Sequence, residues 1–282
     1  MRLGVIADDF TGATDIASFL VQNGMSTVQV NGVPEQPLAH TADALVVSLK
    51  SRSCAPEKAV ADSLQALHWL LEQGCERFYF KYCSTFDSTP RGNIGPVTDA
   101  LLAALGETQT IISPSLPVNG RTVYKGHLFV TDQLLSDSGM RHHPVTPMTD
   151  SNLLRLIEAQ GSGKAGLIDS QTLDRGAEAV RQALEALANK GVRYVVLDAL
   201  NEQHLLIQGE ALRDMRLVTG GSGRAIGLAR QWATDSGAHE KAMLQLESFK
   251  ESAIRSLMGV ENANLKGLLR RVIGKIFNDL EI

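Results

Sequence analysis

The chain has 282 residues, of which 44% are hydrophobic and 21% charged, as in ordinary soluble globular proteins. This length allows one large domain or two modest ones. The net charge of -4 argues against a nucleic-acid-binding protein, which usually carries a basic surplus. Three cysteines without a CxxC pair exclude a disulfide framework and a typical zinc site, and we predict no metal site in the protein itself. The sequence shows neither a signal peptide nor an apolar run of about 20 residues, so we expect a cytoplasmic protein without a membrane partner.

Short apolar runs alternate with longer stretches of helical spacing in the first part of the chain. Predicted strands are Leu3–Ala7, Ser26–Val30, Ala44–Leu49, Arg77–Tyr82 and Thr110–Ser113, and predicted helices are Gly12–Asn23, Glu57–Gln73 and Asn93–Leu105. The segment Asn119–Thr131 is rich in polar and β-forming residues and contains two glycines, which predicts a loop or hairpin.

The alternation then returns. Predicted strands are Ala165–Asp169, Val192–Leu197 and Leu217–Val218, and predicted helices are Ser151–Gln160, Asp174–Asn189, Glu202–Asp214 and Gly223–Thr234. Alternating strands and helices favour an α/β fold with a doubly wound, mostly parallel sheet in three α/β/α layers.

The pattern changes after residue 233. We therefore divide the chain into an α/β domain, residues 1–233, and a helical C-terminal tail, residues 234–282. One face of the last predicted helix is formed by Leu265, Leu269, Val272, Ile276 and Leu280. Such an apolar stripe must be buried, either on the α/β domain or against a second copy of the chain, so the tail is a candidate homo-oligomer contact.

The first candidate site follows the first strand and contains Asp8, Asp9, Thr11 and Gly12. Ligands of doubly wound sheets lie at the carboxyl ends of the strands, where a carboxylate can hold a substrate hydroxyl or accept its proton. The alternative is that Asp9 or Thr11 only caps the next helix. Two adjacent aspartates favour a functional role, because one cap needs only one side chain.

The second candidate site is the loop after the aromatic-rich strand. Its polar residues are Lys81, Ser84, Thr85, Asp87, Ser88, Thr89, Arg91 and Asn93. Many hydrogen-bond donors and a guanidinium suit a polyhydroxylated acid, whereas the structural alternative is a Ser/Thr-rich turn that caps a helix. Because the loops that follow parallel strands share one edge of the sheet, we expect Asp8, Asp9, Asp87 and Arg91 to line one cleft.

Three further segments are weaker candidates. Arg121 lies in a loop that follows another strand, and His143 could donate to an anion. The turn Gly220–Gly223 joins a strand to a helix and could cradle phosphate, although it lacks the GxGxxG and P-loop patterns. Those glycines could equally serve only a tight turn and close packing.

Four stretches resemble, in order, the four-carbon acid sugar kinase family: ADDFTGATDIA from Ala7, FDSTPRGNIGPV from Phe86, PVNGRTVYKGHLFV from Pro117 and VTGGSGRAIGLA from Val218. The resemblance covers about residues 1–233. It implies an N-terminal domain that binds the acid, a C-terminal domain that binds ATP with Mg²⁺, and phosphorylation of the terminal (C4) hydroxyl of a four-carbon sugar acid such as 3-dehydrotetronate.

Phosphoryl-transfer chemistry then predicts residue roles. We expect Asp8 and Asp9 to be the catalytic residues, one of which orients the terminal hydroxyl or accepts its proton late. We expect Arg91, or else Lys81 or Arg121, to neutralise the substrate carboxylate. The predicted substrate-binding residues are Thr11, Gly12, Lys81, Ser84, Asp87, Ser88, Arg91, Asn93, Arg121 and His143. The residues predicted to contact the cofactor ATP are Gly220, Gly221, Ser222 and Gly223.

The tail does not resemble the ATP-binding domain of that family, so we expect the chain to be inactive alone. Two other function classes stay open. One is a non-catalytic domain that binds a sugar acid or a protein. The other is a dinucleotide-dependent enzyme, against which the missing GxGxxG motif argues.

Overall fold

The computed structural model describes residues 2–36, 38, 42–235, 248–257, 262, 264–269 and 272. It divides into two compact units, Met1–Gln231 and Trp232–Ile282. In the second unit the described residues are helical at 248–257 and 264–269, so the tail is helical as predicted. Leu265 and Val272 of the predicted apolar stripe are exposed, whereas Ile276 and Leu280 lie outside the described residues. Burial of that stripe, and an oligomer contact through it, stay predictions.

The first unit is built on an eight-stranded sheet in the order β2-β3-β1-β4-β11-β5-β10-β9, and every pairing in it is parallel. The strands are β1 (Arg2–Ala7), β2 (Thr27–Asn31), β3 (Ala44–Ser48), β4 (Cys75–Lys81), β5 (Thr110–Ser113), β9 (Lys164–Ile168), β10 (Val192–Leu197) and β11 (Leu217–Gly220). The expected hairpin forms a small antiparallel sheet of β6 (Arg121–Tyr124), β7 (His127–Val130) and β8 (Gln133–Leu134). The doubly wound, mostly parallel sheet is therefore confirmed.

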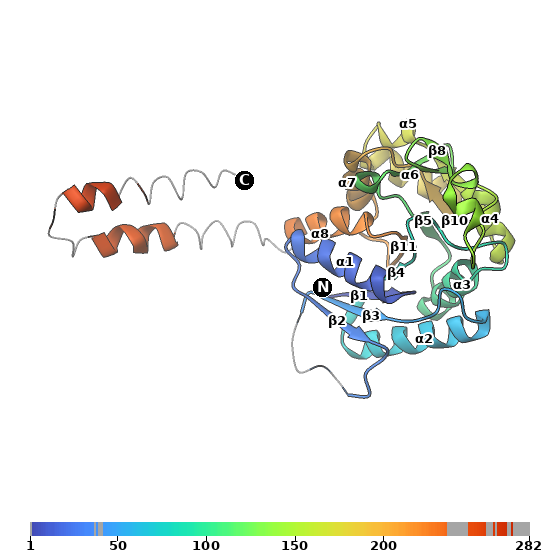
Figure 1. Cartoon of the computed structure of the whole chain (residues 1–282), viewed down its shortest axis with the longest axis horizontal. Helices are drawn as coiled ribbons and strands as arrows, with labels where there is room; N and C mark the ends of the chain where they lie inside the picture. The colour runs from blue at the N-terminus through green and yellow to red at the C-terminus, as the bar shows by residue number, and fades with distance from the viewer. Residues whose placement is uncertain are drawn as a thin grey trace. The chain divides into compact units, whose positions relative to one another are not determined.

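Helices cover both faces of the large sheet (Figure 1). One face carries α2 (Pro56–Glu72), α3 (Ile94–Leu105) and α4 (Leu153–Gln160), which pack side by side. The other face carries α1 (Phe10–Gln22), α6 (Ala177–Ala188), α7 (Glu202–Ala211) and α8 (Arg224–Asp235). These are the three layers that the alternating sequence predicts.

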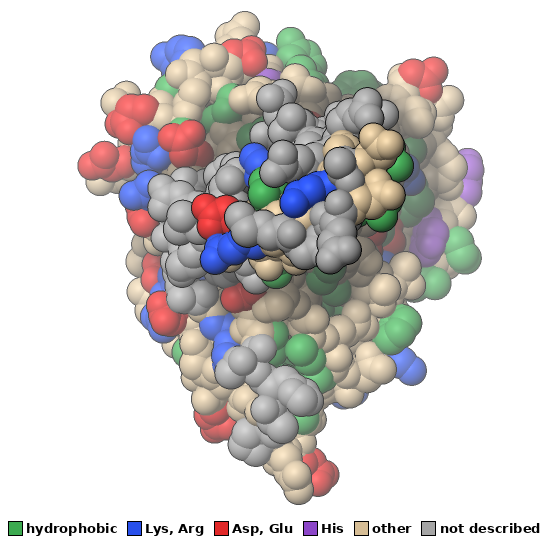
Figure 2. All heavy atoms as spheres, turned by 90° about the vertical axis from the view of Figure 1, so that its left-hand side faces the viewer, with side chains coloured by type: hydrophobic (Ala, Val, Ile, Leu, Met, Phe, Trp, Pro, Cys, Tyr) green, Lys and Arg blue, Asp and Glu red, His purple; other side chains and the backbone are tan. Residues whose placement is uncertain are grey.

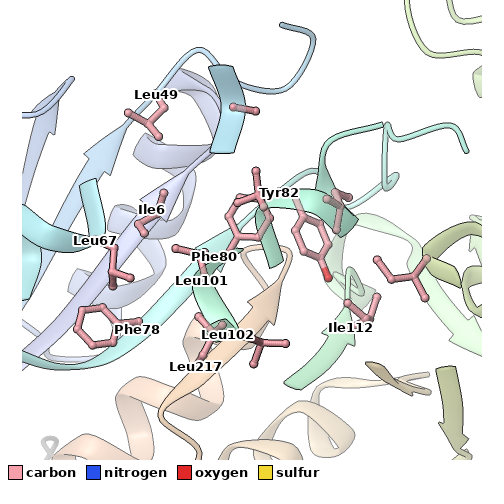
Figure 3. Close-up of a cluster of buried hydrophobic side chains, with 14 of the residues drawn as sticks. Ile6, Leu49, Leu67, Phe78, Phe80, Tyr82, Leu101, Leu102, Ile112 and Leu217 are labelled. Atoms are coloured by element: carbon pink, nitrogen blue, oxygen red, sulfur yellow. The ribbon is translucent and has the colours of Figure 1, made fainter. Parts of the chain in front are cut away.

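The main hydrophobic core lies between the sheet and α2, α3 and α4 (Figure 3). Successive side chains of a strand point to opposite faces, so Ile6, Phe78 and Phe80 enter this core together. The rings of Phe80 and Tyr82 meet edge to face with centroids 5.6 Å apart, and Tyr82 meets Phe86 in the same way at 5.8 Å. The aromatic strand β4 thus anchors the loop that follows it.

The order of the strands creates a switch point between β1 and β4. From β1 the chain continues through α1 to β2 on one side, whereas from β4 it continues through α3 to β5 on the other side. The chain therefore leaves β1 and β4 in opposite directions, and open α/β sheets bind ligands at such a switch point.

Two predicted helices differ in their ends. The helix expected over Asp174–Asn189 is α6, which begins only at Ala177 because Gly176, with φ of 93°, breaks the helical conformation. A separate short helix, α5 (Ser170–Leu173), precedes it and is capped by Asp169. The helix expected to end at Asp214 ends at Ala211. Among the described residues, no helix is long and apolar enough to cross a membrane.

A close contact between α7 and α8 gives a test of this packing. A Cβ atom on Gly227 would lie 2.3 Å from the Leu205 carbonyl oxygen and 3.0 Å from the Gly209 Cα. We predict that Gly227→Ala lowers the free energy of unfolding by about 1–3 kcal/mol, because the helices must move apart.

Urea denaturation measures this change, with Gly139→Ala as the matched control. An ideal Cβ on Gly139 meets no described atom within 4 Å, so that variant should stay within about 0.5 kcal/mol of the wild-type chain. Equal midpoints for the two variants would contradict the close contact.

Candidate functional site

The guanidinium of Arg52 joins carboxylates from two other loops. Its Nε donates to Asp8 Oδ2 at 2.9 Å, and its Nη2 donates to Asp8 Oδ1 at 2.7 Å and to Asp9 Oδ1 at 2.8 Å. Its Nη1 lies 3.7 Å from Asp87 Oδ2. We call Asp8, Asp9, Arg52 and Asp87 the Arg52 cluster. Its members follow β1, β3 and β4, which are neighbours in the sheet, so the cluster lies beside the switch point.

Backbone hydrogen bonds fix the segment that carries Arg52. The Ser51 amide donates to the Asp8 carbonyl at 3.0 Å. The Asn93 side chain donates to the carbonyl oxygens of Ser51, at 2.7 Å, and of Cys54, at 2.9 Å. Asn93 therefore ties the start of α3 to the Arg52 segment, a structural role beside its predicted one in substrate binding.

Asp87 is held by an unusual backbone conformation. Phe86 and Asp87 have φ of 64° and 45°, a left-handed region that non-glycine residues seldom adopt. The Phe86 ring is buried against Tyr82, and the Thr85 hydroxyl donates to Asp87 Oδ1 at 2.9 Å. The buried ring thus holds the turn that aims Asp87 at Arg52. Strain of this kind often accompanies functional sites.

Lys81 lies beneath the cluster with only 3% of its surface exposed. Its ammonium donates to the Tyr82 carbonyl at 2.8 Å, and a Cβ atom on Gly12 would approach that ammonium to 2.7 Å. Glycine at position 12 therefore lets the first turn of α1 lie directly on Lys81. Burial lowers the pKa of Lys81, while the negative charge of Asp8 opposes this shift.

Arg52 and Asp8 stabilise each other's charged forms. Burial alone would lower the pKa of Arg52, but the hydrogen bonds and charge of Asp8 outweigh it, and the pKa is raised. Burial raises the pKa of Asp8, and Arg52 works against that shift. The guanidinium itself stays charged across the physiological pH range.

Ser84, Ser88 and Arg91 make no hydrogen bond or ion pair with Arg52 in the described part of the chain. Ser88 donates to Gln160 Oε1 at 3.0 Å, and Ser84 is half-buried. Arg91 is exposed, and no hydrogen bond or ion pair links its guanidinium to any residue that the structure describes. The structure brings Asp8, Asp9 and Asp87 together as expected, but the guanidinium among them is that of Arg52.

The remaining predicted contacts are scattered. Thr11 is exposed on α1. Arg121, on β6, donates through Nη1 to the Asn119 carbonyl. His143 accepts the Thr146 amide at 3.0 Å through Nδ1. In the described part of the chain, no hydrogen bond or ion pair joins these three to the Arg52 cluster, and their substrate-binding roles stay predictions.

The glycine turn after β11 is packed against the exit of β5. All four residues Gly220–Gly223 are buried, and a Cβ atom on Gly220 would lie 2.3 Å from the Ser113 carbonyl oxygen. The Ser222 hydroxyl donates to Asp15 of α1. This packing gives the glycines a structural function, and it leaves no open phosphate cradle among the described residues of the turn. Contact with ATP stays a prediction.

A cavity of about 670 Å³ lies at the carboxyl ends of β2 and β3, at the edge of the sheet. It is lined by Phe10, Asn31, Gly32, Val33, Ser48, Leu49, Lys50, Asp62 and Gln65. Phe10 directly follows Asp9, and Lys50 is two residues before Arg52. By contrast, the space enclosed behind Asp8, Arg52 and Asp87 is about 10 Å³, enough for about one water molecule. The cluster is therefore accessible from its outer side, where Asp9 and Arg52 are partly exposed.

Sequence reasoning missed Arg52 and Lys50. Their segment, Lys50-Ser51-Arg52, follows the third predicted strand and therefore opens on the same edge as the two candidate sites. That position was a usable signal. What the sequence did not show is that β3 lies next to β1 in the sheet.

Comparisons with known proteins agree with this architecture. A family model described as a sugar-binding N-terminal domain matches residues 3–228. The 3-oxo-tetronate kinase of Pectobacterium atrosepticum is 73% identical over 233 residues, which are 83% of this chain and 55% of that protein. The chain thus spans little more than half the length of this curated relative.

Solved structures share the fold. A Haemophilus influenzae protein aligns with a TM-score of 0.81 and 57% identity, covering 82% of this chain and 56% of that one. A Bordetella bronchiseptica protein, solved as a domain-swapped dimer with bound citrate, aligns with a TM-score of 0.70 and 30% identity, covering 82% and 57%. The chain belongs to the sugar-binding N-terminal domain family and is a homologue of the 3-oxo-tetronate kinases.

Proposed function

We propose that this chain binds a four-carbon sugar acid such as 3-dehydrotetronate and presents its terminal hydroxyl for phosphorylation by ATP. The observation that carries the proposal is the Arg52 cluster at the switch point of the sheet, where three carboxylates surround one guanidinium. The name and 73% identity of the Pectobacterium relative support the reaction class.

The cluster has the chemistry to bind hydroxyl groups. Ionised carboxylates only accept hydrogen bonds, whereas a guanidinium only donates them, so the two together match hydroxyls, which do both. Nη1 of Arg52 makes no hydrogen bond to another described residue, and it lies 3.7 Å from Asp87 Oδ2. It therefore has donors to offer a ligand. The citrate in the Bordetella structure, a hydroxy acid, is consistent with a ligand of this class.

Asp9 is the better placed of the two predicted catalytic residues. Asp8 has 6% of its side chain exposed and is bound twice by Arg52, whereas 29% of the Asp9 side chain is exposed. We propose that Asp9 orients the terminal hydroxyl and accepts its proton late, with Asp8 fixing Arg52 behind it. Phosphoryl transfer relies on such positioning and on charge neutralisation.

ATP supplies the phosphoryl group and carries Mg²⁺ to the site. Because the glycine turn is closed by packing, we propose that most of the nucleotide is held by the part of the longer relatives that this chain does not match. We retain the division into an acid-binding domain, residues 1–233, and a tail, residues 234–282, as part of this proposal. On the face shown in Figure 2, acidic and basic side chains of the described residues are interspersed, and we propose no nucleic-acid partner.

We predict that Asp87→Asn weakens the binding of a four-carbon sugar acid about tenfold and that Arg52→Ala weakens it more. Losing a hydrogen bond to a charged group costs about 1.5–3 kcal/mol, and 1.4 kcal/mol is a factor of ten in affinity. Isothermal calorimetry with 3-dehydrotetronate measures both variants.

Lys190→Ala is the control, since Lys190 is exposed just before β10, at the opposite edge of the sheet. Arg52→Ala leaves Asp8 buried without its partner and is expected to unfold more easily, so Asp87→Asn decides the outcome. Wild-type affinity in Asp87→Asn would contradict the assigned role of the cluster.

We also predict that the chain by itself does not turn over ATP. Phosphoryl transfer requires the nucleotide phosphates in line with the attacking hydroxyl, and the closed turn does not provide this. A coupled ATP assay with 3-dehydrotetronate should detect turnover by the full-length Pectobacterium relative and none by this chain. Comparable turnover from the purified chain would show that it holds a nucleotide site of its own.

A further inference from the structure

The Arg52 cluster is unsuited to the carboxylate end of an acid. It contains three carboxylates but only one guanidinium, and the nearby cation, Lys81, is 3% exposed with its ammonium bonded to the Tyr82 carbonyl. Two like charges about 4 Å apart near a protein surface repel each other by roughly 4 kcal/mol. An acid whose hydroxyls contact Asp9 and Asp87 therefore needs a separate cation for its carboxylate.

Lys50 is such a cation. It lines the 670 Å³ cavity and is exposed. No hydrogen bond or ion pair joins its ammonium to another described residue. The acidic residue that lines the same cavity, Asp62, is paired with Lys58 at 2.8 Å, which leaves the positive charge of Lys50 available.

The spacing also fits. The Cα atoms of Lys50 and Arg52, two residues apart, are at most about 7 Å apart. A four-carbon acid measures about 5 Å from its carboxylate carbon to its terminal oxygen, given carbon–carbon bonds of about 1.5 Å. This Cα separation allows one small ligand to contact both a lysine ammonium at position 50 and the Arg52 cluster when the two side chains extend to the same side of the segment.

We propose that Lys50 binds the carboxylate of the sugar acid and so sets both the preference for acids and the direction in which the ligand lies. This inference rests on the proposed function. It replaces the carboxylate role predicted for Arg91, which is exposed and does not line this cavity. It also separates two tasks: the Arg52 cluster recognises hydroxyls, and Lys50 recognises charge.

The test compares a four-carbon sugar acid with its uncharged amide, which keeps the hydroxyls. Calorimetry should show that the wild-type chain binds the acid more tightly than the amide. Lys50→Ala should weaken acid binding about tenfold and leave amide binding unchanged, so the preference disappears. Lys50→Glu should make the chain prefer the amide, whereas Lys50→Arg should keep the preference for the acid.

The outcomes separate the two proposals. If the wild-type chain binds neither compound, the proposed function fails and the role of Lys50 fails with it. If the acid binds but Lys50→Ala keeps the preference, or Arg91→Ala abolishes it instead, only the role of Lys50 is overturned. Lys190→Ala serves as the control, and because Lys50 is exposed, unchanged urea midpoints should accompany every variant at position 50.

Discussion

The ion pairs of Arg52 are the interaction on which the site depends. One guanidinium holds together the loops after β1 and β3 and lies 3.7 Å from the Asp87 carboxylate after β4. A buried charge is tolerated only when it is paired and hydrogen-bonded, so Arg52 and Asp8 require each other. The two loops cannot move apart without exposing that pair, which keeps the acceptor atoms of Asp9 in a fixed position.

The surrounding packing makes this site rigid. Gly12 lets α1 rest on Lys81, Asn93 ties α3 to the Arg52 segment, and the Phe86 ring holds the turn at Asp87. Gly12, Lys81 and Asn93 are predicted site residues, yet each also contacts the protein itself. Proximity in sequence to a candidate motif therefore does not distinguish residues that support the site from residues that bind a ligand.

The parallel sheet and its helices were predictable because strand and helix periodicities differ and alternate along the chain. The convergence of Asp8, Asp9 and Asp87 was predictable too, since loops that follow parallel strands share one edge. Arg52 was not identified because strand order is set by crossovers that leave no local pattern. The sequence favours Arg91 over Arg52 because Arg91 lies within a polar motif. The direction of a side chain in a loop, however, depends on tertiary packing, here that of the buried Phe86 ring.

A crystal structure of this chain with a four-carbon sugar acid tests the central claim most directly. The account predicts that ligand hydroxyls lie within hydrogen-bonding distance of Asp9, Asp87 and Arg52 Nη1, with the carboxylate directed into the cavity at Lys50. A ligand bound with its carboxylate on Arg52, or bound away from the loops after β1, β3 and β4, would contradict it.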